Sequence, residues 1–229
     1  TRSFVWDSTL GVWDQVREAD RSENKTITSG AISQGNLTVV GDLVPSTPLS
    51  HRNYIINGGF DVWQRGTSCT SGYSADRWNL DLSGGTCTVT QQTFTLGQTD
   101  VPGNPRYYLQ ASTSVGNGNC GINQKIEDVR SGAGQNVTVS FYAKGTNPGG
   151  GTFDLQLLQR FGSGGEANVV TETTVSINSS WTIHTHTFAV PSITDKTVGA
   201  GSNLDFIIRQ TDSDNSTAAW QLDIANVQL

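Results

Sequence analysis

Apolar and polar side chains alternate along much of the chain beyond its midpoint. Residues 137–144 read Val-Thr-Val-Ser-Phe-Tyr-Ala-Lys, and the same period of two recurs over 153–157, 204–209 and 220–224. Successive strand residues point to opposite faces, so this period predicts antiparallel strands with one face buried. After Ala225 the phase slips, because the apolar residues then fall on the other parity, and this slip predicts a β-bulge.

Shorter apolar runs extend the same pattern towards both ends of this region. We expect further strands near residues 86–94, 106–113, 119–127, 168–177 and 180–190. Clusters of Gly, Pro, Asn and Ser separate several of these runs and supply the backbone conformations that turns need. No helical periodicity exceeds two turns. Roughly ten strands predict an all-β fold, an antiparallel jelly-roll β-sandwich over residues 51–229.

The first 50 residues have a different pattern of apolar and polar side chains. In residues 4–16 a Ser-Thr-Leu-Gly turn joins two apolar runs, which predicts a β-hairpin with Trp6 opposite Trp13. Residues 26–43 carry isolated apolar side chains between polar residues and glycines. Residues 44–50 contain two prolines and small polar residues, as expected for an extended spacer.

An isolated hairpin and a few short strands cannot bury their own apolar faces. We therefore expect residues 1–50 to form an N-terminal β stem and linker in which three copies of the chain pack around one axis. An ordinary extended linker is the alternative for residues 26–43. The residues expected to hold the trimer together are Trp6, Trp13, Ile27, Ile32, Leu37, Val39 and Leu43.

Composition narrows the range of partners. Charged residues make up only 15 % of the chain, and 14 basic against 20 acidic residues give a net charge of −6. No basic stripe is present, so nucleic acid is not an expected partner, because phosphate binding needs clustered Lys and Arg. No apolar run approaches the ~18 residues of a membrane helix, so membrane insertion is not expected. A neutral glycan or another protein remains open.

The three cysteines are Cys69, Cys87 and Cys120, so at least one thiol is unpaired. Their spacing leaves a disulfide between Cys69 and Cys87 open. We expect three small buried side chains, because free cysteines are often buried. No CxxC or HxxxH spacing occurs, and zinc is therefore not expected.

Candidate catalytic residues are few. Asp76 and Asp81 flank Trp78, and Glu127 is adjacent to Asp128, but neither pair lies in an acid–base motif. Adjacent strand residues also point to opposite faces. No Gly-x-Ser-x-Gly elbow is present. We therefore expect no catalytic residues and no enzyme.

Metal and cofactor sites are not expected either. His184 and His186 share one strand face, which we predict to be polar, and the sequence offers no third ligand. Residues 212–216 resemble the start of a calcium loop, but Thr217 stands where that loop requires glycine. We expect a turn there.

A glycan site needs an aromatic ring together with amide, carboxylate or guanidinium groups on an exposed sheet face. Four residues on the polar parity of their strands meet this description and would line one groove if their strands are neighbours. They are Tyr108, Tyr142, Gln156 and Arg209. Scattered surface positions or contacts between subunits are the alternative. Trp63, Trp78, Trp181 and Trp220 are expected in the core.

Several short motifs, spread over residues 53–229, resemble the jelly-roll domain of carbohydrate-binding modules and, more closely, the related domain of bacteriophage tail-fibre and virion proteins. The motifs are Asn57-Gly-Gly-Phe60, Trp63-Gln-Arg-Gly66, Ala75-Asp-Arg-Trp78, Val139-Ser-Phe-Tyr-Ala-Lys-Gly145, Trp181 with Thr187-Phe-Ala-Val-Pro191, and Leu222-Asp-Ile-Ala-Asn-Val-Gln-Leu229. Residues 30–43 also resemble the repeated stem sequences of phage fibres.

The resemblance implies a trimeric fibre, tail or capsid-surface protein located in the virion, in contact with other virion proteins and with a glycan or receptor on the host. The carbohydrate-module relatives often hold a structural calcium near the places of Asp61 and Asp223, but that motif is altered here and calcium is not expected. We predict a non-enzymatic tail-fibre protein. The alternatives are a carbohydrate-binding module of a secreted hydrolase and a purely structural capsid or tail protein.

Overall fold

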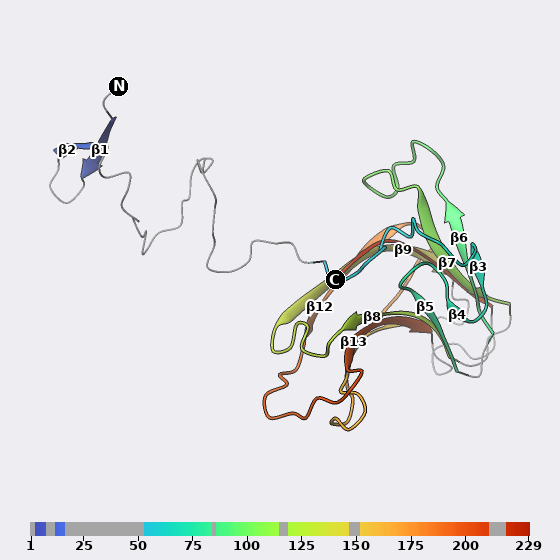
Figure 1. Cartoon of the computed structure of the whole chain (residues 1–229). Coiled ribbons are helices and arrows are strands. Elements are labelled where there is room, and N and C mark those ends of the chain that lie inside the picture. The colour runs from blue at the N-terminus through green and yellow to red at the C-terminus, as the bar shows by residue number, and fades with distance from the viewer. Residues whose placement is uncertain are drawn as a thin grey trace. The chain divides into compact units, whose positions relative to one another are not determined.

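A computed structural model describes residues 3–7, 12–16, 53–83, 86–114, 119–146, 152–210 and 219–229 (Figure 1). Of residues 3–7, 12–16, 81–83 and 119 it describes the backbone only. The chain divides into two compact units, residues 1–50 and 51–229. Within the described part, no helix has the length and hydropathy of a membrane span.

The described part of the first unit is one antiparallel strand pair. Strand β1 (Ser3–Asp7) pairs with β2 (Val12–Val16), and the register places Trp6 opposite Trp13, as the sequence predicts. The other residues expected to form the stem lie outside the described residues. They are Ile27, Ile32, Leu37, Val39 and Leu43.

The second unit is a sandwich of two antiparallel sheets, which Figure 1 shows as two layers. Its strands are β3 (Ser68–Cys69), β4 (Gly72–Tyr73), β5 (Asn79–Ser83), β6 (Thr88–Thr93), β7 (Tyr107–Thr113), β8 (Asn119–Glu127), β9 (Asn136–Thr146), β10 (Phe153–Arg160), β11 (Val169–Val175), β12 (Thr182–Ala189), β13 (Asn203–Gln210) and β14 (Trp220–Gln228). Sheet 1 has the order β11-β10-β13-β8-β5-β4, and sheet 2 has the order β12-β9-β14-β7-β6-β3. The described residues contain no helix, so the all-β prediction is confirmed.

The alternating strands pack as their pattern predicts. Val139, Phe141 and Ala143 of β9 are buried in the core between the sheets, and every second residue of β10, β13 and the first part of β14 is buried there too. The predicted bulge is also present, because the register of β14 against β9 shifts between Ala225 and Gln228. Asn226 lies inside this bulge with a left-handed φ of 51°.

The strands β3, β4 and β5 were not expected from the pattern. The two shortest have two residues each, too few for a period to show. The segment before them is fixed by the end of the chain. The Tyr54 amide donates to the Leu229 carbonyl at 2.8 Å, and the Val227 amide donates to Gly58 at 3.0 Å. A Cβ at Gly58 would collide with the Val227 carbonyl, so only glycine fits this approach.

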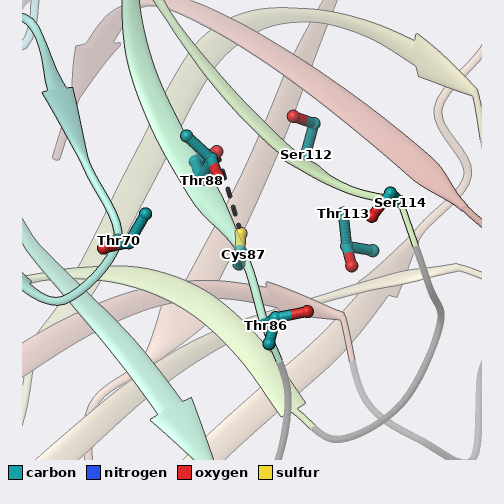
Figure 2. A pocket seen from close by; sticks show the side chains of 7 residues that line it. All are labelled: Thr70, Thr86, Cys87, Thr88, Ser112, Thr113 and Ser114. Atoms are coloured by element: carbon teal, nitrogen blue, oxygen red, sulfur yellow. Dashed lines mark hydrogen bonds between the residues drawn. The ribbon is translucent and has the colours of Figure 1, made fainter.

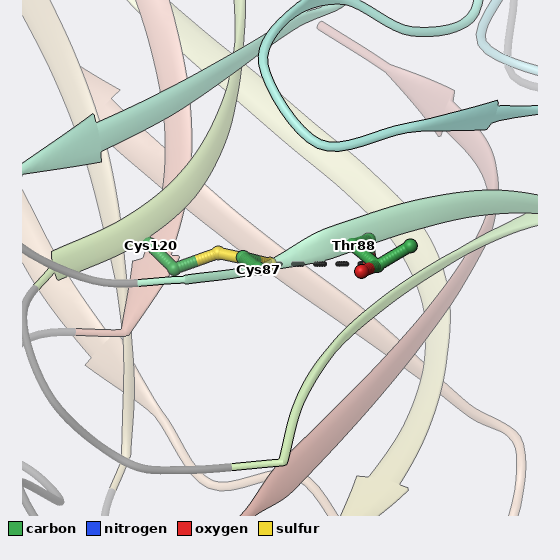
Figure 3. The surroundings of a disulfide bond; sticks show 3 residues. All are labelled: Cys87, Thr88 and Cys120. Carbon is green, nitrogen blue, oxygen red and sulfur yellow. Dashed lines mark hydrogen bonds between the residues drawn. A yellow bond between two sulfur atoms is a disulfide. The ribbon is translucent and has the colours of Figure 1, made fainter.

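A disulfide joins Cys87 to Cys120, with the two Cα atoms 6.2 Å apart (Figure 3). Cys87 directly precedes β6 of sheet 2, whereas Cys120 lies on β8 of sheet 1, so the bond connects the two sheets. The expectation of three unpaired cysteines, and the alternative pair of Cys69 with Cys87, were therefore wrong. Sheet packing brings Cys120 next to Cys87, and sequence spacing does not contain that information. Cys69 keeps a free thiol.

Candidate functional site

One row of side chains crosses the whole outer face of sheet 1. The strand registers place Tyr73 opposite Asn79, Asn79 opposite Asn123, Asn123 opposite Ile207, Ile207 opposite Gln156, and Gln156 opposite Glu172. We call these six residues the central row. Because opposed residues point to the same face and neighbouring strands lie ~4.8 Å apart, the row is about 24 Å long. Asn123, Ile207 and Gln156 in the middle of the row are buried, so a ligand can reach the row at its ends, at Tyr73 and Asn79 and at Glu172.

Hydrogen bonds fix the polar members of this row. The Asn79 amide donates to Asn123 at 3.1 Å, and Asn123 donates to the Asp205 carboxylate at 2.7 Å. The Arg160 guanidinium donates to the same carboxylate at 3.1 Å. Asp205 is fully buried although it lies on an outer face. Asn123 is buried as well, so this network fixes the partly exposed Asn79 and Arg160 side chains from within the protein.

The far part of the same face carries further paired groups. Gln156 donates to Glu172 at 2.7 Å, and Arg209 lies 3.6 Å from the Asp154 carboxylate. Gly121 lies opposite Arg209, and a Cβ at this position would approach the Arg209 Cβ to 2.6 Å. Glycine at position 121 therefore leaves the room that the Arg209 side chain occupies.

A hollow of about 340 Å³ lies at the other end of the row. Its lining residues are Tyr73, Arg77, Asn79, Lys125 and Glu127. Tyr73 is half-exposed, with 51 % of its surface accessible. The Arg77 guanidinium lies 3.4 Å from the Glu127 carboxylate, so the hollow has both charges at its rim and an aromatic ring beside them. The hollow therefore combines an aromatic ring with hydrogen-bonding groups.

The four residues expected to line one groove occupy two different faces. Gln156 and Arg209 lie on β10 and β13, which are neighbours in sheet 1. Tyr108 and Tyr142 lie on β7 and β9 of sheet 2, on either side of β14. Each pair shares a face, but the sandwich separates the pairs. The prediction of a single groove was therefore wrong, because alternation fixes which residues point outward and not which sheet a strand joins.

The outer face of sheet 2 has its own polar row. Lys144, Asp223 and Gln110 are opposite one another on adjacent strands. Burial raises the pKa of Asp223, opposed by hydrogen bonds from Gln110 and Gln221 and by the Lys144 charge. Burial also raises the pKa of Tyr108, and the Asp223 charge adds to this effect.

The tryptophans expected in the core are not all there. Trp78 and Trp220 are buried, and Trp63 packs partly against the core and donates to the Phe60 carbonyl. Trp181 instead contacts Tyr108, which points outward from sheet 2, with ring centroids 5.3 Å apart. The expectation was wrong for Trp181, because it directly precedes β12 and joins the outer face rather than the core.

The acidic residues considered for catalysis have structural contacts where the structure describes their side chains. Asp76 accepts the Gln64 amide at 2.8 Å. Glu127 pairs with Arg77 at the surface. Asp128 accepts the Arg130 amide, and this hydrogen bond lowers the pKa of Asp128.

The histidines share a face, as predicted, but it is not the polar face. The register places His184 opposite Phe141 of the core, and the two rings stack at 5.4 Å. His186 contacts Phe188 at 4.6 Å. Burial lowers the pKa of His184. Among the described residues, no three His, Cys, Asp or Glu side chains converge as metal ligands. Residues 212–216 lie outside the described residues.

A second hollow, of about 410 Å³, lies beside the disulfide (Figure 2). Its lining residues are Thr70, Thr86, Cys87, Thr88, Ser112, Thr113 and Ser114. Figure 2 shows hydroxyl side chains around the Cys87 sulfur, and these lining residues include neither an aromatic ring nor a charged group. We assign it no function.

Comparison with known proteins gives a fold and no family. No family model and no curated protein matches the sequence. Among solved structures, the enzymatically active domain of tailspike protein 4 from bacteriophage CBA120 is 16 % identical with a TM-score of 0.50. The match covers 77 % of this chain and 21 % of that one. A cyclase from Fischerella sp. TAU is 13 % identical with a TM-score of 0.50, covering 76 % of this chain and 93 % of that one.

Carbohydrate-binding modules also match. The module TmCBM61, solved in complex with β-1,4-galactotriose, is 13 % identical with a TM-score of 0.43, and the match covers 77 % of this chain and 97 % of the module. At these identities, the two structures with a TM-score of 0.50 show a shared β-sandwich fold, and they show no more than the fold.

Proposed function

We propose that this chain is a non-enzymatic bacteriophage virion protein, specifically a tail fibre. Its β-sandwich binds a host-surface glycan on the outer face of sheet 1. The observation that carries the glycan part is the exposed end of the central row, where Tyr73 and Asn79 line a hollow with charged groups at its rim. This end combines an exposed tyrosine ring with the partly exposed Asn79 amide, which its hydrogen bond to Asn123 holds in place. Sugars present hydroxyl groups that such fixed donors and acceptors recognise, while an aromatic ring contacts their C–H face.

The proposal of a non-enzymatic role is supported by the hydrogen bonds that the acidic residues of this face accept from neighbouring side chains. Asp205 is buried and receives hydrogen bonds from Asn123 and Arg160, so its oxygens are occupied. Glycoside hydrolysis needs two carboxyl groups facing each other across a substrate. On the central row, Glu172 is the sole acidic member, and it accepts a hydrogen bond from Gln156.

The virion part of the proposal is supported by the resemblance to phage fibre sequences and by a fold that is shared with a phage tailspike domain. Three sandwiches on one stem would bind a glycan-covered surface with an avidity that one shallow site does not reach. The alternative is a carbohydrate-binding module of a secreted hydrolase, which uses the same face of sheet 1 and predicts a monomer.

A glycan array of bacterial surface polysaccharides tests the binding function. The full chain is compared with Arg77→Ala, which alters the hollow, and with Arg130→Ala, a matched control that removes an exposed arginine paired to Asp128 outside the row. We expect binding by the wild type and Arg130→Ala and at least a tenfold weaker signal for Arg77→Ala. No binding by the wild type, or equal binding by all three, would contradict the proposal.

A further inference from the structure

Three aromatic rings meet on the side of the sandwich opposite the central row. Phe94 lies 4.8 Å from Tyr108 and 5.2 Å from Trp181, and Tyr108 lies 5.3 Å from Trp181, measured between ring centroids. Phe94 directly follows β6, Tyr108 lies on β7, and Trp181 directly precedes β12. We call these three residues the aromatic platform. Segments distant in sequence thus contribute one ring each to a single cluster.

The platform lies on the outer face of sheet 2. Tyr108 is next to Leu109, which is buried in the core, so the Tyr108 side chain points to the other face. All three rings are partly exposed. Partly exposed rings contribute less to stability than buried ones, because less of their apolar surface leaves water. Packing of the fold alone therefore gives a weak reason for three large rings in this place.

Charged groups lie beneath the rings. The Lys144 ammonium is 5.1 Å from the Trp181 ring centre and 5.9 Å from that of Tyr108, within the range of cation–π contacts. It is also 3.8 Å from the carboxylate of buried Asp223. Gln110 and Gln221 each donate to the same carboxylate, at 2.9 and 3.0 Å. Asp223 is therefore held in place, and an ammonium has three donors, so Lys144 retains donors for a ligand.

The contacts between the rings restrict the class of ligand. A cage for a cationic ligand needs rings that are separated by the width of the guest, whereas these rings touch one another. Lys144 moreover already supplies a cation at this place. A flat ligand with a C–H face and a rim of hydroxyls fits better. Its C–H face can stack on an exposed ring, while its hydroxyls reach Lys144 and the Trp181 indole N–H, which donates to none of the described residues.

A hollow of about 310 Å³ continues from the platform. It is lined by Thr93, Phe94, Thr95, Leu96, Asn104, Pro105 and Arg106. Phe94 belongs to both the hollow and the platform, and Leu96 is 91 % exposed. The hollow offers space for a second sugar unit beside the ring stack. We propose that the aromatic platform is a second carbohydrate site, which stacks a pyranose ring on the face opposite the central row; this extends the proposed glycan-binding function to a separate site.

The test follows the indole N–H resonances of the full ¹⁵N-labelled chain while methyl glycosides of galactose, glucose, mannose, rhamnose and N-acetylglucosamine are added. Trp181→Phe identifies the Trp181 resonance. We expect a saturable shift of that resonance with at least one glycoside. The indoles of Trp63 and Trp78, which donate to the carbonyls of Phe60 and Asn57, serve as internal controls and should not move. No Trp181 shift with any of the five glycosides would overturn the platform site.

Two variants separate this inference from the proposed function. Phe94→Ala should reduce the affinity reported by the Trp181 resonance at least fivefold while the remaining spectrum shows an intact fold. Arg77→Ala, on the opposite face, should leave that affinity unchanged. If Arg77→Ala abolishes the Trp181 shift, the platform is not an independent site and the inference fails. If array binding depends on Arg77 while Trp181 responds to no glycoside, the proposed function stands and the platform inference falls.

Discussion

Cys87 is bonded to Cys120 of the other sheet, although Cys69 is close to it. Cys69 of β3 lies opposite Val89 of β6, and Val89 is two residues after Cys87. The disulfide closes a loop with a sequence separation of 33 residues. A cross-link of this length removes conformational entropy from the unfolded chain, by the chain-entropy relation about 3–4 kcal/mol. It therefore stabilises the sandwich by linking its two layers.

We predict that Cys87→Ser lowers the melting temperature by about 10 °C, because 1 kcal/mol corresponds to ~2–4 °C for a domain of this size. Thermal unfolding followed by circular dichroism measures the change. Cys69→Ser is the matched control and should shift the melting temperature by no more than ~2 °C. An equal loss in both variants would show that the cross-link is not the source of the stability.

The buried Asp205 carboxylate predicts a large effect of a single substitution. Asp205→Ala leaves Asn123 and Arg160 without their acceptor, and the cost of removing one partner of a buried pair is ~3–5 kcal/mol. Urea unfolding measures this loss. Glu127→Ala, which removes an exposed pair with Arg77, should cost less than ~1 kcal/mol. Equal losses would contradict the role assigned to the Asp205 network.

The stacked His184 ring predicts a pH-dependent stability. Burial holds the pKa of His184 below its ordinary value of 6.5, so the unfolded chain binds more protons at this site than the folded chain as the pH falls. The neutral His184 ring therefore makes its full contribution to the stability above about pH 6.5. This contribution is lost as the pH falls from there towards the pKa of the folded state. We expect the wild type to lose more free energy of unfolding than His184→Gln between about pH 8 and pH 5, as measured by urea unfolding at the two pH values. A difference that is independent of pH would refute this.

The expected stem predicts the oligomeric state. If residues 1–50 pack around a three-fold axis, multi-angle light scattering of the full chain should give three times the mass of one chain at micromolar concentration. A chain lacking residues 1–50 should give the mass of a monomer, since the second unit is compact by itself. A monomeric full chain would instead favour the module of a secreted hydrolase.

Local pattern alone predicts much of this fold. The period of two over residues 137–144 identified a strand with its buried face, and the phase slip after Ala225 located the bulge. Both features depend on neighbouring residues in one strand. The short strands β3 and β4 have too few residues for any period, so their pairing with β6 and β5 depends on contacts from elsewhere in the chain.

The candidate sites depend on the lateral order of strands, which pattern does not contain. Gln156 and Tyr108 both have the outward parity, but one lies in sheet 1 and the other in sheet 2. Asn79, Asn123 and Gln156 form one row through pairings between distant segments. Trp181 is expected in the core because it belongs to a motif of the fold, and its place beside Tyr108 arises from packing across sheet 2.

A matched pair of tyrosines tests the central claim most directly. Tyr73 ends the central row, and Tyr107 lies on sheet 2; each contacts one arginine, Arg65 at 5.4 Å and Arg106 at 5.0 Å. Isothermal titration with the glycan selected on the array compares Tyr73→Ala with Tyr107→Ala in the full chain. The account predicts binding that is at least tenfold weaker for Tyr73→Ala than for Tyr107→Ala. Wild-type affinity in Tyr73→Ala would contradict it.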